Sequence, residues 1–300
     1  MARTDVMTTA RRIRRQLSSG HRFDQLVLLN TIDDSTTSVT IDGTLPAGLI
    51  AGAMLCVDVE LMRVRSVNAT TNSVNVLRGY LDSTAAEHLS GALIDLNARF
   101  SLLDIFEAMR AELASWPPDL YQAADDTFTV DTGIATYELP SIWATALGVI
   151  DVRQSDERTS EETTWPRLPH RVYRGSSSGF DGATTSGLLL RFLEPVRSGA
   201  LHITVALPIT SDIAVGDDLA TAHGLNDGLL DVLELGVKRR LIHDGEHARS
   251  SRDAQDEIRR SEETPIGAMT SIHQMQNAIY TRRRAEEANR LRRFYPIRQS

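Results

Sequence analysis

The segment His243-Asp244-Gly245-Glu246-His247 is the part of the chain that most resembles a metal-binding motif. On a helix, two histidines four residues apart lie on one face and supply half of a metal site. Zinc hydrolases of the HExxH type place a glutamate directly after the first histidine, where it acts as the base. Here Asp244 occupies that position, and Gly245 is expected to interrupt the helix between the two histidines. We therefore interpret the segment as a polar helix end, and keep a metal-dependent hydrolase that uses His243, Asp244, Glu246 and His247 as an alternative.

Other catalytic motifs are missing from the sequence. It has no Gly-x-Ser-x-Gly turn, and its one lysine, Lys238, follows no glycine-rich phosphate loop. Its one cysteine, Cys56, lies in the apolar run 53–57, where a thiol packs as a small hydrophobic side chain. No cysteine and histidine spacing suits zinc. The sequence thus predicts a protein that is not an enzyme, with no catalytic residue, no metal and no cofactor.

Arginine is concentrated at the two ends of an acidic chain. The formal net charge is −8, yet residues 1–22 hold six arginines and one acid, and residues 265–300 hold seven arginines and two acids. Basic ends of this kind dock on acidic surfaces, such as neighbouring copies in an oligomer or DNA. The N-terminal cluster comprises Arg11, Arg12, Arg14 and Arg15.

The C-terminal cluster combines arginines with two aromatic residues: Arg282, Arg283, Arg284, Arg290, Arg292, Arg293, Phe294 and Tyr295. We expect this arm to contact a partner protein. Two alternatives are nucleic-acid binding through stacking and phosphate contacts, and a solvated helix end whose cations suit the helix dipole. Removal of residues 281–300 is expected to leave the fold intact and to impair assembly.

Two stretches of short, β-branched segments predict small antiparallel β domains. In the first, residues 23–98, turn sequences such as 68–73 separate the candidate strands, which are 25–29, 38–41, 55–59, 61–64 and 73–77. Residues 121–210 repeat the pattern with longer polar loops. Each stretch is typical of a barrel or a sandwich.

The remaining segments are expected to be helical. Residues 99–120 are amphipathic and end at Trp116-Pro117-Pro118, because proline stops a helix. Residues 211–264 supply further core helices, and residues 265–300 a last helix with a basic arm. Residues 1–22 form an N-terminal basic arm, in which residues 3–18 are expected to form a short helix. The predicted fold class is α+β, with a bundle-like helical core, one or two small antiparallel β barrel or sandwich domains, and extended terminal arms.

The most specific pattern in the sequence lies between residues 60 and 91. Its members are Glu60, Arg78, Gly79, Thr84, His88 and Gly91. Gly79 permits a turn with positive φ after a strand. Thr84 is expected to cap a short helical turn over residues 85–89, which Gly91 would end. His88 would then bond back to the barrel, so we interpret it as a structural histidine.

This stretch resembles a small β domain that recurs in structural proteins of tailed-bacteriophage necks and tails, with Ser83 where the family has glycine. The order of elements along the whole chain is similar to that of head-to-tail connector (adaptor) proteins. The resemblance implies a homo-oligomeric ring of about twelve copies below the portal, through which DNA passes without sequence-specific binding. It also implies contacts with the portal and with other neck or tail proteins, assembly in the host cytoplasm, and a location in the neck of the virion.

A tail-tip, baseplate or minor tail protein is a second interpretation, because the same β domain decorates such proteins. The location in the virion separates the two. No apolar run in the sequence approaches the ~20 residues of a membrane helix, so no membrane partner is expected.

Overall fold

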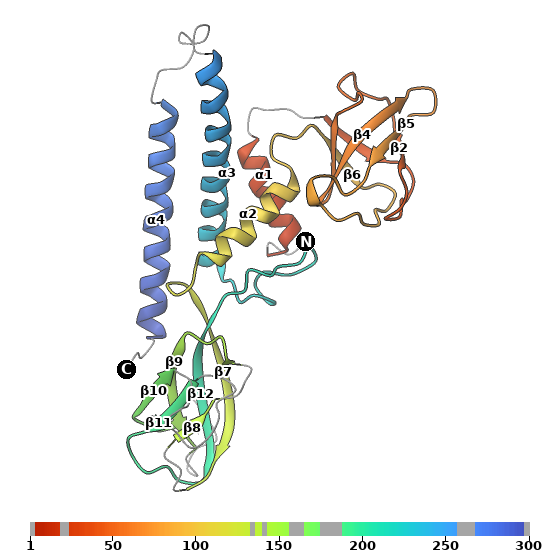
Figure 1. Ribbon diagram of the computed structural model, residues 1–300. Helices are drawn as coiled ribbons and strands as arrows, with labels where there is room; N and C mark the ends of the chain where they lie inside the picture. The colour runs from red at the N-terminus through yellow and green to blue at the C-terminus, as the bar shows by residue number, and fades with distance from the viewer. Residues whose placement is uncertain are drawn as a thin grey trace. The chain divides into compact units, whose positions relative to one another are not determined.

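A computed structural model of the 300-residue chain describes residues 4–18, 24–132, 136–139, 143–155, 165–174, 188–256 and 268–296. Within these ranges, side chains are described except at positions 138, 174, 243–256 and 268–273. The chain divides into two compact units (Figure 1). We call Met1–Leu113 with Ser211–Thr281 the barrel unit, and Ala114–Thr210 with Arg282–Ser300 the sandwich unit.

The barrel unit contains a closed, antiparallel, six-stranded barrel. Alternation of apolar and polar residues sets the inward face, as in β5, where Val74 and Val76 are buried and Asn75 is exposed. The strand order is β1-β2-β5-β4-β3-β6, so β6 closes the barrel by pairing with both β1 and β3. The strands are β1 (Asp24–Leu28), β2 (Ser38–Asp42), β3 (Met54–Val57), β4 (Glu60–Asn68), β5 (Ser73–Leu77) and β6 (Leu93–Leu96), with a short 3-10 turn, η1 (Tyr80–Asp82).

Helix α1 (Val6–Leu17) packs within the same unit. Its first turn is capped by Asp5, whose side chain accepts a hydrogen bond from Thr8 N at 2.7 Å. Val6, Ala10 and Ile13 recur on one helical face and are completely buried. The N-terminal segment is therefore held in the fold by an apolar face.

Three further helices are α2 (Leu102–Ala114), α3 (Asp227–Asp256) and α4 (Ala268–Phe294). Within the barrel unit they meet at Glu112 of α2, which is completely buried. Its carboxylate accepts hydrogen bonds from Arg240 Nε of α3, at 2.6 Å, and from the Tyr280 hydroxyl of α4. α3 approaches this closely because it carries Gly236, where an added Cβ would lie 2.3 Å from Glu112 Cδ.

The sandwich unit consists of two three-stranded antiparallel sheets, ordered β7-β12-β9 and β10-β11-β8. Val149, Leu190 and Ile203 belong to one buried cluster that draws side chains from both sheets, so the sheets pack face to face. On the other face of the first sheet, Ala206 packs with Leu291 of α4. The strands are β7 (Tyr121–Val130), β8 (Thr136–Glu138), β9 (Gly148–Gln154), β10 (His170–Arg174), β11 (Leu188–Phe192) and β12 (Gly199–Pro208).

The predicted bundle-like helical core is wrong. The protein is mixed α+β; two of its described hydrophobic clusters lie inside the barrel and the sandwich, and a third lies between a sheet face and α4. The apolar stripes of the sequence fall on helices, but a stripe specifies only that a face is buried and leaves its packing partner open. The short helix predicted over residues 3–18 is present as α1 (Val6–Leu17), but it is docked in the fold, so the prediction of an extended N-terminal arm is wrong.

The five strands predicted within residues 23–98 correspond to β1–β5, and β6, which closes the barrel, is not among them. The helix predicted at residues 99–120 ends at Ala114, just before the two prolines.

Among the described residues, no helix combines the length and the apolar character that crossing a membrane would require.

Candidate functional site

The sequence pattern of residues 60–91 converges on one buried carboxylate, that of Glu60, the first residue of β4. Glu60 is 1 % exposed and forms a two-point ion pair with Arg78, with Nε–Oε1 at 2.7 Å and Nη2–Oε2 at 2.8 Å. His88 Nε2 lies 2.9 Å from Glu60 Oε2. The backbone N–H groups of Gly79 and Ala86 also donate to the carboxylate. We call Glu60, Arg78 and His88 the buried triad.

Arg78 extends this network into the loops around the barrel end. Its guanidinium donates to the carbonyl oxygens of Asp33, Thr36 and Ala86 at 2.6, 2.8 and 2.6 Å. One arginine therefore ties the β1–β2 connection to the segment that follows β5. The positive φ expected at Gly79 is present, at 59°, and a Cβ there would lie 2.9 Å from the Ser83 carbonyl oxygen.

The charges of the triad stabilise one another. Burial disfavours a charged imidazole, but hydrogen bonds to Asp58 and Glu60 outweigh this effect and raise the pKa of His88 to about 9. Burial likewise disfavours the carboxylate of Glu60, while hydrogen bonds from Arg78 and His88 hold its pKa at about 2. His88 is thus a cation at neutral pH that ties a loop to the barrel, in keeping with a structural role.

The remaining members of the motif differ in their roles. The helical turn expected over residues 85–89 is absent, so Thr84 caps no helix. Ser83 instead attaches this segment to β4: its hydroxyl donates to the Leu61 carbonyl oxygen and accepts from Leu61 N at 3.0 Å. Gly91 has a φ of 87°, and its N–H donates to the Leu28 carbonyl oxygen at 2.8 Å, which ends the loop before β6.

The N-terminal arginines are used inside the barrel unit. Arg11 lies 3.2 Å from Asp58 of the β3–β4 turn, and Arg12 pairs with Glu234 of α3. Arg14 is 8 % exposed and pairs with the buried Asp95 of β6. Arg15 is exposed and donates from Nε to the Arg11 carbonyl oxygen. Three of the four cations of the predicted arm therefore hold α1 against the barrel and α3.

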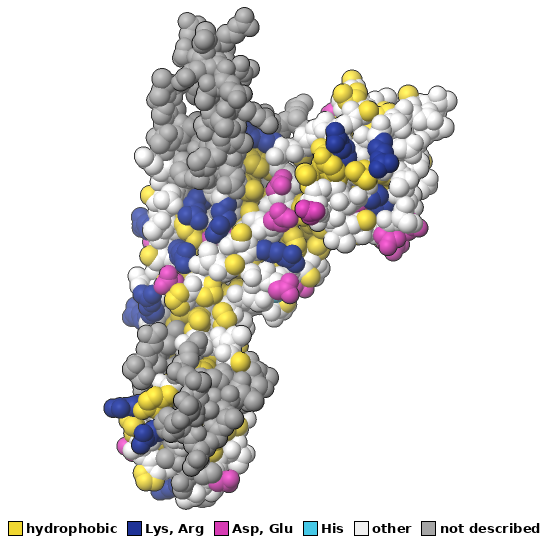
Figure 2. Space-filling view, in the orientation of Figure 1, with side chains coloured by type: hydrophobic (Ala, Val, Ile, Leu, Met, Phe, Trp, Pro, Cys, Tyr) yellow, Lys and Arg dark blue, Asp and Glu magenta, His cyan; other side chains and the backbone are white. Residues whose placement is uncertain are grey.

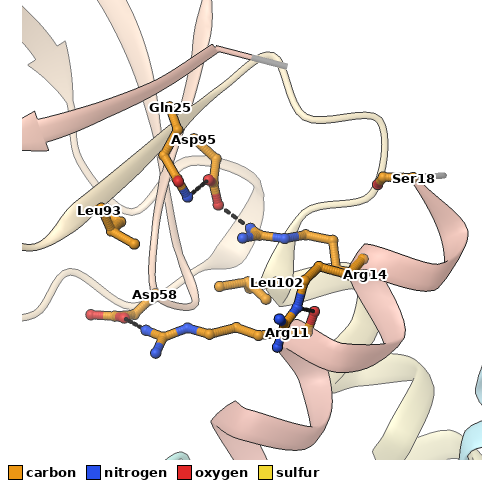
Figure 3. Close-up of a pocket in the computed structure, with 9 residues that line it drawn as sticks. Arg11, Arg14, Ser18, Gln25, Asp58, Leu93, Asp95 and Leu102 are labelled. Atoms are coloured by element: carbon orange, nitrogen blue, oxygen red, sulfur yellow. Dashed lines mark hydrogen bonds and ion pairs between the residues drawn. The ribbon is translucent and has the colours of Figure 1, made fainter. Parts of the chain in front are cut away.

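A cleft of about 440 Å³ remains between α1 and the barrel. Figure 3 shows Arg11 and Arg14 reaching from α1 toward Asp58 and Asp95 on the barrel side. We call this the α1 cleft, and its lining residues are Arg11, Arg14, Arg15, Ser18, Gln25, Asp58, Leu93, Asp95 and Leu102. Sequence reasoning missed Asp58 and Asp95, because an acidic residue next to a strand carries no signal of its distant partner.

The C-terminal arginines pair largely within their own unit. Arg284 donates to the Ser115 carbonyl oxygen and Arg292 to Asp119, each at 2.9 Å. Arg282 and Arg283 both pair with Glu286, and Arg290 pairs with Glu287. Figure 2 shows basic side chains interspersed with acidic and apolar ones over α4.

The end of α4 is not the extended arm that the sequence predicted. Phe294 is the last residue of the helix, and the Tyr295 carbonyl oxygen accepts a hydrogen bond from the Tyr121 hydroxyl. Arg293, Phe294 and Tyr295 are nevertheless exposed. The side chain of Arg282, at the other end of the predicted arm, is likewise accessible, at 81 % exposed.

The candidate metal cluster at 243–247 lies where side chains are not described. The interruption expected at Gly245 is absent, because α3 runs through it to Asp256. Among the described residues, no group of three histidines, cysteines or acids is arranged to hold a metal ion. Cys56 is buried, which raises the pKa of its thiol to about 11 and keeps it protonated at neutral pH.

Comparison with known proteins assigns no family to the chain. No protein-family model matches the chain, and no curated protein sequence matches it.

Proposed function

We propose that this protein is a structural component of a tailed-bacteriophage particle, namely a head-to-tail adaptor that forms a ring between the portal and the tail. It would join the capsid to the tail and let DNA pass through its centre. Its partners would be further copies of itself, the portal protein and other neck or tail proteins, and its place would be the neck of the virion.

The single observation that carries this proposal is the buried triad. Glu60, Arg78 and His88 are separated by up to 28 residues in the chain, yet they share one carboxylate at 2.7–2.9 Å. They are the residues on which the resemblance to phage neck and tail domains rests. Their burial gives them a structural role, which suits a module whose purpose is to present a fixed surface.

The distribution of charge supports the same proposal. The barrel surface carries exposed acidic residues, among them Asp34, Asp42 and Glu87. An acidic surface repels the phosphate backbone of DNA, so duplex can slide past it without being held. This is the behaviour required of a DNA channel.

A phage mutant that lacks this protein tests the proposal. We expect DNA-filled heads and completed tails that fail to join, and joining should be restored by supplying the wild-type protein. Particles that assemble fully but fail to adsorb to the host would favour a tail-tip or baseplate role. Normal yields of infectious particles would overturn the proposal.

A further inference from the structure

A strained turn on the barrel presents a leucine to solvent. Leu81 and Asp82 have φ values of 54° and 60°, a left-handed conformation that residues with a Cβ adopt at a cost. Leu81 is nevertheless 63 % exposed, so burial of its own side chain does not offset this cost. Local strain of this kind often marks a functional surface. We call residues 79–83 the Leu81 turn.

The Leu81 turn is fixed at both ends. At its start, Gly79 N donates to the buried Glu60, and at its end the Ser83 hydroxyl bonds to the backbone of Leu61. The Arg63 guanidinium lies 5.5 Å from the centre of the Tyr80 ring. The leucine and the aspartate are therefore held in one orientation before any partner arrives, which lowers the entropic cost of binding.

The α1 cleft has a complementary character. Its Arg14 and Asp95 neutralise each other, and its Arg11 pairs with Asp58. Arg15 is left as an exposed cation at its edge. Most of its lining residues are polar, and its apolar members are Leu93, which is 46 % exposed, and Leu102, which is 2 % exposed. The cleft thus offers one exposed leucine beside a net positive edge.

We infer that the α1 cleft receives the Leu81 turn of a second copy of this chain. Leu81 would lie against Leu93 and Leu102, and Asp82 would face Arg15. Leu81 is exposed and does not line the cleft of its own chain, so the contact has to be made between copies. Repeated in one direction, such a contact between two different surfaces generates a ring when the rotation between neighbouring copies closes, as the proposed function requires. The inference rests on the proposed function and specifies which surfaces join the subunits.

Charge reversal of the full-length protein tests this contact, with sedimentation velocity at several concentrations as the readout. We expect Asp82→Arg and Arg15→Glu each to weaken self-association at least tenfold, because each places like charges together. The double variant Asp82→Arg/Arg15→Glu should recover most of the wild-type association. Both positions are exposed, so the fold should be unaffected, and circular dichroism melting verifies this.

Removal of the leucine supplies a second test with a matched control. Leu81→Ser should weaken association, whereas Leu89→Ser should not, although Leu89 is 67 % exposed on the same barrel. Equal losses in the two variants would indicate unspecific apolar contacts and overturn the inference.

The failure of the inference differs from the failure of the proposed function. If the charge variants associate as well as the wild-type protein does, the proposed docking is overturned, but the proposed ring is not. A wild-type protein that stays monomeric at every concentration would also overturn the docking. The phage mutant described above would then still decide the proposed function.

Discussion

Glu60 is the residue on which the end of the barrel depends. Its carboxylate pairs with both Arg78 and His88 and also accepts hydrogen bonds from two backbone N–H groups. A buried charge without its partner is far less favourable than the intact pair, so each member of the triad requires the others. The triad stabilises the loop that carries the Leu81 turn, which links a buried ion pair to the proposed assembly surface.

Replacement of Glu60 by alanine should lower the free energy of unfolding by about 3–5 kcal/mol, since Arg78 would be left buried without a carboxylate and His88 would keep only Asp58. Urea denaturation measures this change. The exposed Glu87 of the same barrel is the control, and Glu87→Ala should stay within about 0.5 kcal/mol of wild type. Similar values for the two variants would show that the triad contributes little.

The charge of His88 makes stability depend on pH. Its pKa is raised in the fold from 6.5 to about 9, so its contribution is complete below about pH 6.5 and is lost as pH rises through about 9. The difference in free energy of unfolding between wild type and His88→Gln should therefore be largest near neutral or lower pH and shrink above about pH 9. A difference that stays constant from about pH 6 to about pH 10 would contradict a charged His88.

For Glu60 the dependence of stability on pH has the opposite sign. The pKa of Glu60 is lowered in the fold from 4.5 to about 2, so its contribution is present above 4.5 and is lost as pH falls through about 2. The stability lost between these two pH values should be smaller in Glu60→Ala than in wild type. An equal loss in both proteins, measured by thermal unfolding, would assign the acid sensitivity to other carboxylates.

Among the elements, α2 and α3 can approach each other only because of a glycine. Gly236 leaves room for the buried Glu112, which lies 2.3 Å from the position of an added Cβ. Gly236→Ala should destabilise the protein by about 1–3 kcal/mol despite the better helix propensity of alanine. Gly216→Ala is the control, since nothing lies within 4 Å of its Cβ position. Chemical denaturation compares the two, and a stabilised Gly236→Ala would contradict this packing.

The C-terminal half of α4 belongs to the sandwich unit. Leu291 packs with Ala206 and Tyr121, and Arg284 and Arg292 bond to Ser115 and Asp119. The structure therefore argues against the expectation that residues 281–300 can be removed without harm to the fold.

Truncation after Thr281 should lower the melting temperature, because it uncovers one face of the β7-β12-β9 sheet. Leu291→Asp should cost about 2 kcal/mol for the same reason, while Arg293→Ala, an exposed position, should cost less than about 0.5 kcal/mol. A truncated protein that melts at the same temperature as wild type would show that this segment does not stabilise the fold and is a free arm.

Local patterns predicted the elements better than their assembly. The alternation at Val74 and Val76 marks a strand from sequence alone, whereas closure of the barrel depends on β6 pairing with β1, almost 70 residues earlier. His88 could be interpreted as structural and Glu60 belongs to the same sequence pattern, but nothing local indicates that these two residues, 28 positions apart, form a pair. The arginines of residues 11–15 looked like a free arm because their partners, Asp58, Asp95 and Glu234, are distant in the chain.

The whole molecule consists of two β modules, each with its own hydrophobic core, together with helices that belong to one unit or continue from one into the other. The terminal arginines that gave the sequence its basic ends are largely paired with acids of the same chain. The contact that we propose between copies therefore rests on the Leu81 turn and the α1 cleft, and not on the two arginine clusters as a whole.

Cryo-electron microscopy of the phage particle tests the central claim, that this chain joins head and tail, most directly. We predict a ring of copies between the portal vertex and the tail, with the six-stranded barrel recognisable in each subunit. The protein's absence from the particle, or its presence only at the distal end of the tail, would contradict the claim.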